Sequence, residues 1–234
     1  MQGDVRKALV VGASRGIGLG LVQRLLERGW AVTATVREPS RTGLPDLAGD
    51  AAGRLVVETV DITEPGQVDV LHDRLSAGHP FDLLLVNAGT THERWETVGE
   101  VSTQTFVRVM VTNALGPMRF VERFADLVAT TGTIAVMSSG QGSVANNIRV
   151  TGWEVYRASK AALNQLMRSY AARHPDDPRT LLLLAPGWVR TEMGGEDAPL
   201  SVEESTRGVV DTVEANAGHG GLRFLDHRGA TVAW

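Results

Sequence analysis

Short apolar runs alternate along the chain with longer segments in which apolar residues recur every three or four positions. The runs have the length and composition of buried strands, and they lie at residues 6–12, 30–36, 55–60, 81–86, 133–137, 179–185 and 221–226. Helical periodicity separates most of them, at residues 17–28, 64–77, 102–129, 155–173 and 201–216. This alternation predicts an α/β fold, a doubly wound, Rossmann-like parallel sheet with helices on both faces.

Two of the predicted helices carry further local signals. Asn113 and Pro117 stand four residues apart inside the long helical segment. Asparagine is a poor residue for a helix interior, and proline removes the hydrogen bond to the carbonyl four residues back. We therefore expect either a kink or a loop between two helices at this point. Ser201 and Glu204 have the spacing of a capping box, which predicts a helix beginning there.

The composition narrows the class of protein. The 234 residues are 43% hydrophobic and carry a formal net charge of −4 without a basic stripe, so a large core is expected and nucleic-acid binding is not. There is no cysteine, and the six histidines form no pair at i and i+4, so neither a disulfide nor a metal site is predicted. No apolar run approaches the roughly 18 residues of a membrane span. We expect one cytoplasmic domain covering residues 1–234.

A glycine-rich turn joins the first predicted strand to the first predicted helix. It reads G-A-S-R-G-I-G and places Gly12, Gly16 and Gly18 between the two elements. Strand, glycine turn and helix in this order are typical of a dinucleotide site, because the glycines let a pyrophosphate approach the free N–H groups of the helix. The spacing differs from the more familiar G-x-G-x-x-G, and a tight turn without a ligand is the alternative.

The residues after the second predicted strand indicate which dinucleotide binds. In dinucleotide folds this position meets the adenosine ribose, where an acid binds the 2′-hydroxyl and an arginine binds a 2′-phosphate. Arg37 occupies it here, Ser40 and Arg41 follow, and Arg15 lies in the glycine turn. Two guanidinium groups can clamp a phosphate, so we predict NADP(H) in preference to NAD(H). The negative charge of Glu38 would repel a phosphate at this position. The alternative is that the arginines are solvated loop residues that bind no ligand.

Tyr156 and Lys160 stand four apart at the start of a predicted helix, so they share one face. A phenol loses its proton near pH ~10, which is too high for a base at neutral pH. An ammonium group about 4 Å away is worth on the order of 4 kcal/mol at an effective dielectric constant of ~20, or roughly three pKa units. Lys160 could therefore bring the pKa of Tyr156 close to a catalytic range. The alternative is that these are an ordinary tyrosine and a solvated lysine on a helix face, without a catalytic role.

Further short motifs complete a pattern that spans essentially the whole chain. They are Asp61-Ile62, Asn87-Ala88-Gly89, Asn113, Ser138-Ser139, Tyr156-x-x-x-Lys160 and Pro186-Gly187-Trp188-Val189-Arg190-Thr191. In this order and spacing they resemble the short-chain dehydrogenase/reductase family. The segments after Ser138, around Tyr156 and near the final D-H-R-G are similar to its subgroup of C-factor and sniffer-type carbonyl reductases.

The resemblance implies a role for each matching residue. Tyr156 would be the general acid/base, Ser139 would hydrogen-bond the substrate carbonyl oxygen, and Lys160 would bind the nicotinamide ribose and lower the Tyr156 pKa. Asn113 would hold a water in a proton relay, and Thr191 would contact the cofactor carboxamide. The other positions implied to bind the cofactor are Gly12, Ser14, Arg15, Gly16, Ile17, Gly18, Arg37, Asp61, Ile62, Asn87, Ala88, Gly89, Tyr156, Pro186, Gly187 and Val189.

The chain departs from the family pattern in three places. The family usually has threonine before the first glycine and a second asparagine before Asn87, where this chain has Val11 and Val86. An apolar contact would replace the polar link between strands without leaving an orphan donor. The Ser139–Tyr156 spacing of 17 is longer than usual, which leaves Ser138 and Ser143 as alternatives to Ser139.

For Asp61, a role as a cap for the next helix stays open beside a contact with adenine.

Together these features predict an NADPH-dependent reductase that transfers a hydride to a ketone or aldehyde. Keto reduction in fatty-acid or polyketide synthesis is a variant of this chemistry, and an NADP(H)-sensing regulatory protein without important turnover is the alternative from another class. By analogy with relatives, we expect a homodimer or homotetramer that acts on a small carbonyl or alcohol. Candidate pocket walls, with packing in the core or at the rim as the alternative, are Trp95, Trp153, Trp188 and Met193.

Overall fold

The computed structural model describes residues 5–40, 42–51, 53–78 and 80–234. Seven strands form one sheet in the order β3-β2-β1-β4-β5-β6-β7, and every neighbouring pair is parallel. The strands are β1 (Lys7–Val11), β2 (Ala31–Val36), β3 (Leu55–Thr59), β4 (Phe81–Val86), β5 (Val128–Met137), β6 (Thr180–Ala185) and β7 (Gly221–Asp226). The predicted Rossmann-like parallel sheet is confirmed.

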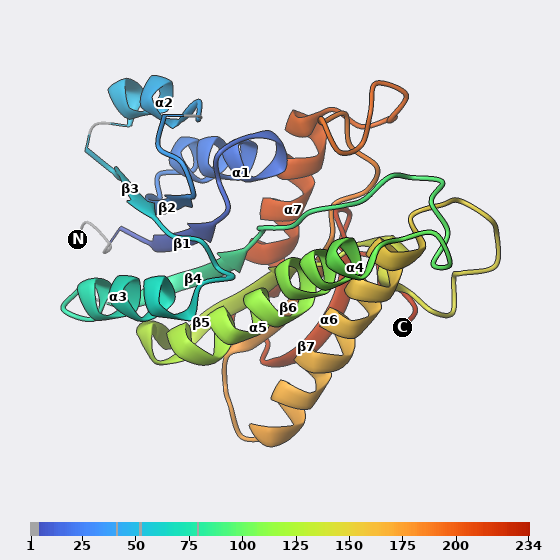
Figure 1. Ribbon diagram of the computed structural model, residues 1–234. Coiled ribbons are helices and arrows are strands. Elements are labelled where there is room, and N and C mark those ends of the chain that lie inside the picture. Colours follow the sequence, from blue (N-terminus) through green and yellow to red (C-terminus); the bar gives the residue numbers. More distant parts are fainter. Residues whose placement is uncertain (1–4, 41, 52, 79) are drawn as a thin grey trace.

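Helices cover both faces of the sheet (Figure 1). They are α1 (Gly16–Glu27), α2 (Leu44–Asp50), α3 (Pro65–Leu75), α4 (Thr103–Met110), α5 (Gly116–Phe124), α6 (Glu154–Arg173) and α7 (Val202–Asn216). Side chains of α1 and α7 join one buried cluster, and those of α3, α5 and α6 join the other. In β1, Ala8 and Val10 belong to the first cluster, while Leu9 and Val11 belong to the second. Both faces of this strand are buried, which explains its continuous apolar run.

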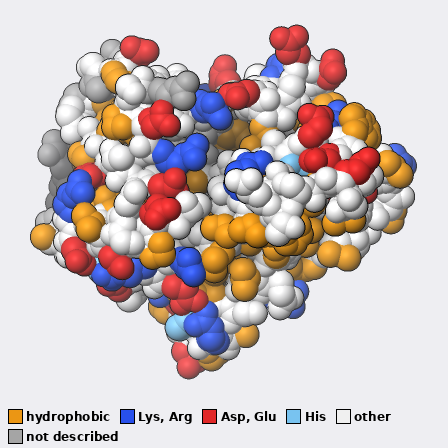
Figure 2. All heavy atoms as spheres, in the orientation of Figure 1, with side chains coloured by type: hydrophobic (Ala, Val, Ile, Leu, Met, Phe, Trp, Pro, Cys, Tyr) orange, Lys and Arg blue, Asp and Glu red, His pale blue; other side chains and the backbone are white. Residues whose placement is uncertain are grey.

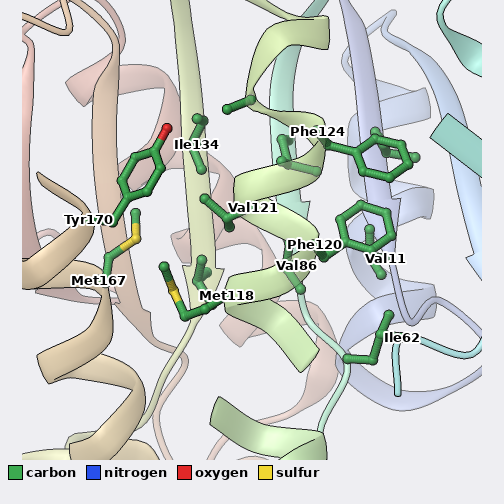
Figure 3. Packing of buried hydrophobic residues seen from close by; sticks show 14 of the residues in the cluster. Val11, Ile62, Val86, Met118, Phe120, Val121, Phe124, Ile134, Met167 and Tyr170 are labelled. Atoms are coloured by element: carbon green, nitrogen blue, oxygen red, sulfur yellow. The ribbon is translucent and has the colours of Figure 1, made fainter. Parts of the chain in front are cut away.

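The cluster beneath α5 and α6 contains Val11 and Val86, the two positions at which the chain departs from the polar family pattern (Figure 3). Val11 of β1 and Val86 of β4 are register partners, and they are 0% and 1% exposed. Phe120 and Phe124 of α5 belong to the same cluster and stack with ring centroids 4.0 Å apart. The predicted apolar contact between the two strands is therefore confirmed.

The predicted boundary between the long helical segment and the next strand was wrong. Helix α5 ends at Phe124, a 3-10 turn (η2) covers Ala125–Leu127, and β5 begins at Val128 rather than at residue 133. Thr130 and Thr131 are exposed, so the start of this strand lacks the apolar run of its buried part. Helix α2 was not predicted at all, because its seven residues include a proline and a glycine and are too few to show a period.

The regular α-helix is interrupted at Asn113 and Pro117, as expected, and the interruption is a π turn rather than a loop. A π-helical turn, η1 (Val111–Leu115), connects α4 directly to α5. The N–H of Gly116 bonds the carbonyl of Val111, five residues back. Pro117 follows in the first turn of α5, a position that tolerates proline. Asn113 lies inside this π turn and is completely buried, which is typical of π turns at functional sites.

Helix α7 begins at the predicted capping box. Ser201 Oγ accepts a hydrogen bond from the Glu204 N–H at 3.1 Å, and the Glu204 carboxylate accepts one from the Ser201 N–H at 2.8 Å. The two bonds satisfy N–H groups at the start of the helix, and they fix the end of the loop that follows β6.

Candidate functional site

The carboxyl edge of the sheet brings the predicted site residues together. Strand order runs outward from the neighbours β1 and β4 in opposite directions, so a switch point lies between them, and ligands of such sheets bind outside the strand ends there. A notch in the surface lies between the side of α2 and the loop before α7 (Figures 1 and 2). The predicted residues follow β1 (Gly12, Ser14, Arg15, Gly16, Ile17, Gly18), β2 (Arg37), β3 (Asp61, Ile62), β4 (Asn87, Ala88, Gly89), β5 (Ser139) and β6 (Pro186, Gly187, Val189, Thr191).

The glycine turn packs directly against the segment that follows β4. Gly12 has a φ of +84°, and a Cβ added there would lie 2.7 Å from Ala88 Cα. A Cβ on Gly18 would lie 2.1 Å from the Gly12 carbonyl oxygen, which accepts a hydrogen bond from Asn87 Nδ2 at 2.9 Å. Helix α1 then begins without a side-chain cap or an acidic residue in its first turn. Its free N–H groups and the lack of side chains in the turn fit a dinucleotide pyrophosphate.

The two arginines predicted to bind a 2′-phosphate lie in different surroundings. Arg37 is exposed at the end of β2. Arg15 is also exposed, but its Nη1 lies 2.7 Å from Glu192 Oε2, on the loop after β6. The sequence pattern did not indicate this ion pair, because no local spacing connects the two residues. Arg41 lies outside the described residues.

The residues after β3 are held by local contacts. Asp61 Oδ1 accepts hydrogen bonds from the N–H and the Oγ1 of Thr63, at 2.9 and 2.7 Å. The carboxylate therefore closes a turn, whereas the N-cap position of α3 belongs to Glu64. Ile62 is buried, and a Cβ on Gly116 would lie 3.2 Å from its Cδ1. The cap alternative for Asp61 was wrong, and its contact with adenine stays a prediction.

The loop after β6 reaches back to the glycine turn. The Pro186 carbonyl accepts a hydrogen bond from Ser205 Oγ at 2.7 Å, which ties the start of the loop to α7. Thr191 Oγ1 accepts one from the Gly194 N–H at 3.0 Å. A Cβ on Gly16 would lie 3.3 Å from Thr191 Cγ2, so the loop and the turn are in close reach of each other.

Lys160 and Tyr156 share one face of α6, as predicted, but their electrostatics differ from the expectation. Lys160 Nζ donates a hydrogen bond to the Met137 carbonyl at 2.8 Å and lies 5.9 Å from the centroid of the Tyr156 ring. Burial lowers the pKa of Lys160 to about 8. Burial also raises the pKa of the Tyr156 phenol, and a hydrogen bond with Ser139 offsets only part of that rise. The expected lowering of the Tyr156 pKa by Lys160 was wrong, because the ammonium group is turned to a carbonyl and burial dominates.

The three candidate serines have different surroundings. Ser138 is 2% exposed, and its Oγ donates a hydrogen bond to Asn164 Oδ1 at 2.6 Å. Ser143 is 1% exposed, and its Oγ accepts an N–H within its own turn at 3.1 Å. Ser139 is less buried than either, and its side chain interacts with Tyr156. The geometry therefore favours Ser139 for contact with a substrate.

Asn113 connects three parts of the site. Its Nδ2 donates hydrogen bonds to the Thr90 carbonyl at 2.8 Å and to Ser159 Oγ at 2.9 Å, and its Oδ1 accepts one from the Thr90 N–H at 2.7 Å. Ser159 Oγ in turn donates to the Tyr156 carbonyl at 2.6 Å. The sequence interpretation missed Thr90 and Ser159. Their positions, directly after N-A-G and inside Y-x-x-x-K, were the available signals.

Gly89 lies where these groups converge. A Cβ added to it would lie 3.4 Å from Asn113 Oδ1 and 3.7 Å from Lys160 Nζ. Its lack of a side chain therefore leaves space beside Lys160 at the end of β4.

The predicted pocket walls fall into two separate groups. The guanidinium carbon of Arg94 lies 4.7 Å from the Trp95 ring centroid and 4.5 Å from that of Trp153. Trp95 lines a cavity of about 490 Å³ between its own loop, residues 141–152 and α6. Of the candidate catalytic residues only Ser143, the alternative to Ser139, lines this cavity. Trp188 and Met193 are 43% and 41% exposed on the loop after β6. Neither residue lines that cavity.

Comparison with known proteins identifies the class of enzyme. The family model described as short chain dehydrogenase matches residues 6–199. The chain belongs to this family. Among the described residues of this short-chain dehydrogenase, no group of three His, Asp or Glu side chains could hold a metal ion. Nor does that part of the chain contain a helix that is long and apolar enough to cross a membrane.

Three relatives cover most of this short-chain dehydrogenase. C-signal of Myxococcus xanthus is 37% identical over 158 residues, which are 66% of this chain and 93% of that protein. A protein described as a short-chain dehydrogenase/reductase of Burkholderia multivorans, solved with bound NADP, is 54% identical with a TM-score of 0.95 over 98% of this chain and 100% of that one. A carbonyl reductase of Pseudomonas aeruginosa PAO1 in complex with NADP is 41% identical with a TM-score of 0.91 over 99% and 100%. The predicted oxidoreductase class and its carbonyl reductase relatives are confirmed.

Proposed function

We propose that this short-chain dehydrogenase is an NADPH-dependent reductase that transfers a hydride to a ketone or aldehyde. The main support is that Ser139 interacts with Tyr156, and that Tyr156 shares a helix face with Lys160 beside Gly89. The glycine turn lies at the same edge of the sheet. Two solved relatives hold NADP, which supports the same cofactor here.

NADP(H) would lie across the switch point of the sheet. The glycine turn and the start of α1 would hold the pyrophosphate, and Arg15 and Arg37 would bind the 2′-phosphate, which gives the preference over NAD(H). Lys160 would hold the nicotinamide ribose and Thr191 the carboxamide. The remaining predicted cofactor residues would line the path between these points.

The side chains around Tyr156 would complete the reduction. When bound, the nicotinamide supplies the hydride. Burial raises the pKa of the Tyr156 phenol, so at neutral pH the phenol carries the proton that a general acid must give to the substrate oxygen. Ser139 Oγ would donate a hydrogen bond to the same oxygen as charge develops on it. Asn113 would hold a water through which the proton is replaced from solvent.

The proposal extends to the assembly and the cellular location of the protein. We propose that the whole chain acts as one cytoplasmic oxidoreductase domain and forms a homodimer or homotetramer through α4 and α6. Phe106, Val107 and Leu166 on these helices are 40%, 49% and 40% exposed, and hydrophobic side chains gather over this region (Figure 2). Leu166→Glu should lower the mass measured by light scattering, and an unchanged mass would exclude this face as the interface.

A screen of NADPH oxidation with varied ketones and aldehydes tests the proposed reaction. Wild-type protein should oxidise NADPH with some of them, whereas Tyr156→Phe should bind NADPH with nearly unchanged affinity and lose several decades of turnover. Turnover that survives in Tyr156→Phe would contradict the role of the phenol.

A dinucleotide-sensing regulatory protein is the second candidate, and the similarity to C-signal favours it. Such a protein would bind NADPH without turning over any carbonyl. In cells, its phenotype would persist in the Tyr156→Phe variant, while a phenotype that depends on reduction would be lost.

A further inference from the structure

The ion pair between Arg15 and Glu192 occupies one of the two arginines proposed to bind the 2′-phosphate. Arg15 is the N-cap residue of α1, and Glu192 follows Thr191 on the loop between β6 and α7. Their Nη1 and Oε2 atoms are 2.7 Å apart, and the side chains are 71% and 73% exposed. Both groups are therefore open to an incoming ligand.

The position of Glu192 is fixed by the turn on which it stands. The Gly194 N–H donates to Thr191 Oγ1 at 3.0 Å, and the Gly195 N–H donates to the Thr191 carbonyl at 2.9 Å. Trp188 Nε1 donates to the Gly194 carbonyl at 2.7 Å. These bonds close the loop on itself, so the carboxylate is presented to Arg15 by an ordered backbone.

A carboxylate and a phosphate both bind a guanidinium through its N–H groups, and Glu192 already engages Nη1 of Arg15. We propose that Glu192 is a specificity-determining residue that competes with the 2′-phosphate of NADP(H) for Arg15. The inference rests on the proposed function. A phosphate can take the Nη1 hydrogen bond of Arg15 only by displacing the Glu192 carboxylate, whereas NAD(H) carries no 2′-phosphate to compete for it. Glu192 therefore lowers the preference for NADP(H) that the two arginines create.

The effect has a bounded size. Exposed ion pairs contribute little to stability, because water screens both charges. Removal of the competing carboxylate should tighten NADPH binding by about two- to fivefold. NADH has no 2′-phosphate, so its affinity should not change by this route.

Calorimetric titration of wild type and Glu192→Gln with NADPH and with NADH tests the competition. The expected result is tighter binding of NADPH and unchanged binding of NADH. Glu196→Gln is the matched control, since Glu196 is an exposed acid on the same loop and among the described residues has no ion pair. If Glu192→Gln weakens the binding of NADPH and NADH equally, the Arg15–Glu192 pair closes over the dinucleotide, and the inference is overturned.

The same titrations in an Arg15→Ala background separate this inference from the proposed function. There, Glu192→Gln should leave the affinities for both cofactors unchanged. A tightening that persists without Arg15 would mean direct repulsion of the phosphate and would overturn competition for Arg15. If Arg15→Ala weakens NADPH selectively but Glu192→Gln alone has no effect, only the role of Glu192 fails. If Arg15→Ala weakens both cofactors equally, the proposed phosphate site itself fails.

Discussion

Lys160 Nζ donates a hydrogen bond of 2.8 Å to the main-chain carbonyl of Met137, and the side chain is only 3% exposed. The bond joins α6 to the last residue of β5. It holds an ammonium group at the sheet edge, in surroundings that penalise its charge.

The first prediction concerns stability against pH. Burial lowers the pKa of Lys160 from 10.5 to about 8 in the folded protein. Below about pH 8, Lys160 is protonated in both the folded and the unfolded protein, so the cost of burying its charge is fully present. Between about pH 8 and 10.5 the folded state loses the proton while the unfolded state keeps it, so stability rises with pH. The free energy of unfolding of wild type relative to Lys160→Met should rise by roughly 3 kcal/mol across this window. Urea unfolding of wild type and Lys160→Met at several pH values measures this difference, and Lys7→Met is the control. If the free energies of unfolding of wild type and Lys160→Met change in parallel with pH, the prediction is contradicted.

Alanine substitutions of the two serines at the end of β5 should have different effects, one mainly on turnover and the other on stability. Ser139→Ala should lower turnover on the order of a hundredfold, as expected for loss of one donor to the developing oxyanion. It also removes the acceptor of the Gln141 N–H in the short turn after β5, which should cost about 1 kcal/mol of stability or less. Ser138→Ala leaves the buried Asn164 Oδ1 without its donor and should cost about 1–3 kcal/mol of stability. Turnover and thermal unfolding of both variants measure this. A larger loss of turnover in Ser138→Ala would reverse the assignment.

Asn113→Ala should lower both stability and turnover. It removes three hydrogen bonds to Thr90 and Ser159, which at about 1 kcal/mol each amounts to roughly 3 kcal/mol. Loss of the proposed proton relay should reduce turnover by about tenfold or more. Thr90→Ala keeps the main-chain bonds to Asn113 and is the control. Equal turnover in the two variants at a temperature where both are folded would argue against a relay.

Arg37→Asp should weaken NADPH far more than NADH. It removes a positive charge from the proposed phosphate site and adds a repulsive one, which should cost on the order of 3 kcal/mol, or roughly a hundredfold in Kd. Titration with both cofactors measures the difference. An equal loss for both would mean that Arg37 does not contact the 2′-phosphate.

Gly18→Ala should damage both folding and cofactor binding. The added methyl group would lie 2.1 Å from the Gly12 carbonyl oxygen, so the turn must move. Overpacking of this kind costs about 1–3 kcal/mol or more, and displacement of the turn should weaken both NADPH and NADH. Gly66→Ala, in α3 where nothing lies within 4 Å of the added atom, should be neutral or stabilising. Cofactor affinity and unfolding of the two variants give the comparison.

The sheet and most of the candidate site could be predicted because their signals are local. A strand buried on both faces is an apolar run, and the motifs follow the strand ends in order, so a parallel sheet brings them to one edge. The interruption of the helix near Pro117 was also predictable, since proline lacks an N–H, but the π turn that it takes was not.

The features that could not be predicted from the sequence depend on contacts between distant segments. The Arg15–Glu192 pair joins two loops with no common motif. The raised pKa of Tyr156 arises from burial that only the folded chain provides. Strand β5 pairs with β4 at Val128 and again from Thr133 onward, and the exposed residues Thr130 and Thr131 lie at the register shift between these two points.

The pairing of β1 with β4 ties the first strand of the chain to one that is synthesised much later. The Lys7 N–H donates a hydrogen bond to Asp82 Oδ2 across 75 residues. At roughly 5–20 residues per second, a ribosome needs about 4–15 s to make that stretch. During this time β1 can pair with β2 on one side only, and its other edge stays unpaired between apolar surfaces. Such an edge invites association with other nascent chains, so slow translation between β1 and β4 should reduce the yield of soluble protein.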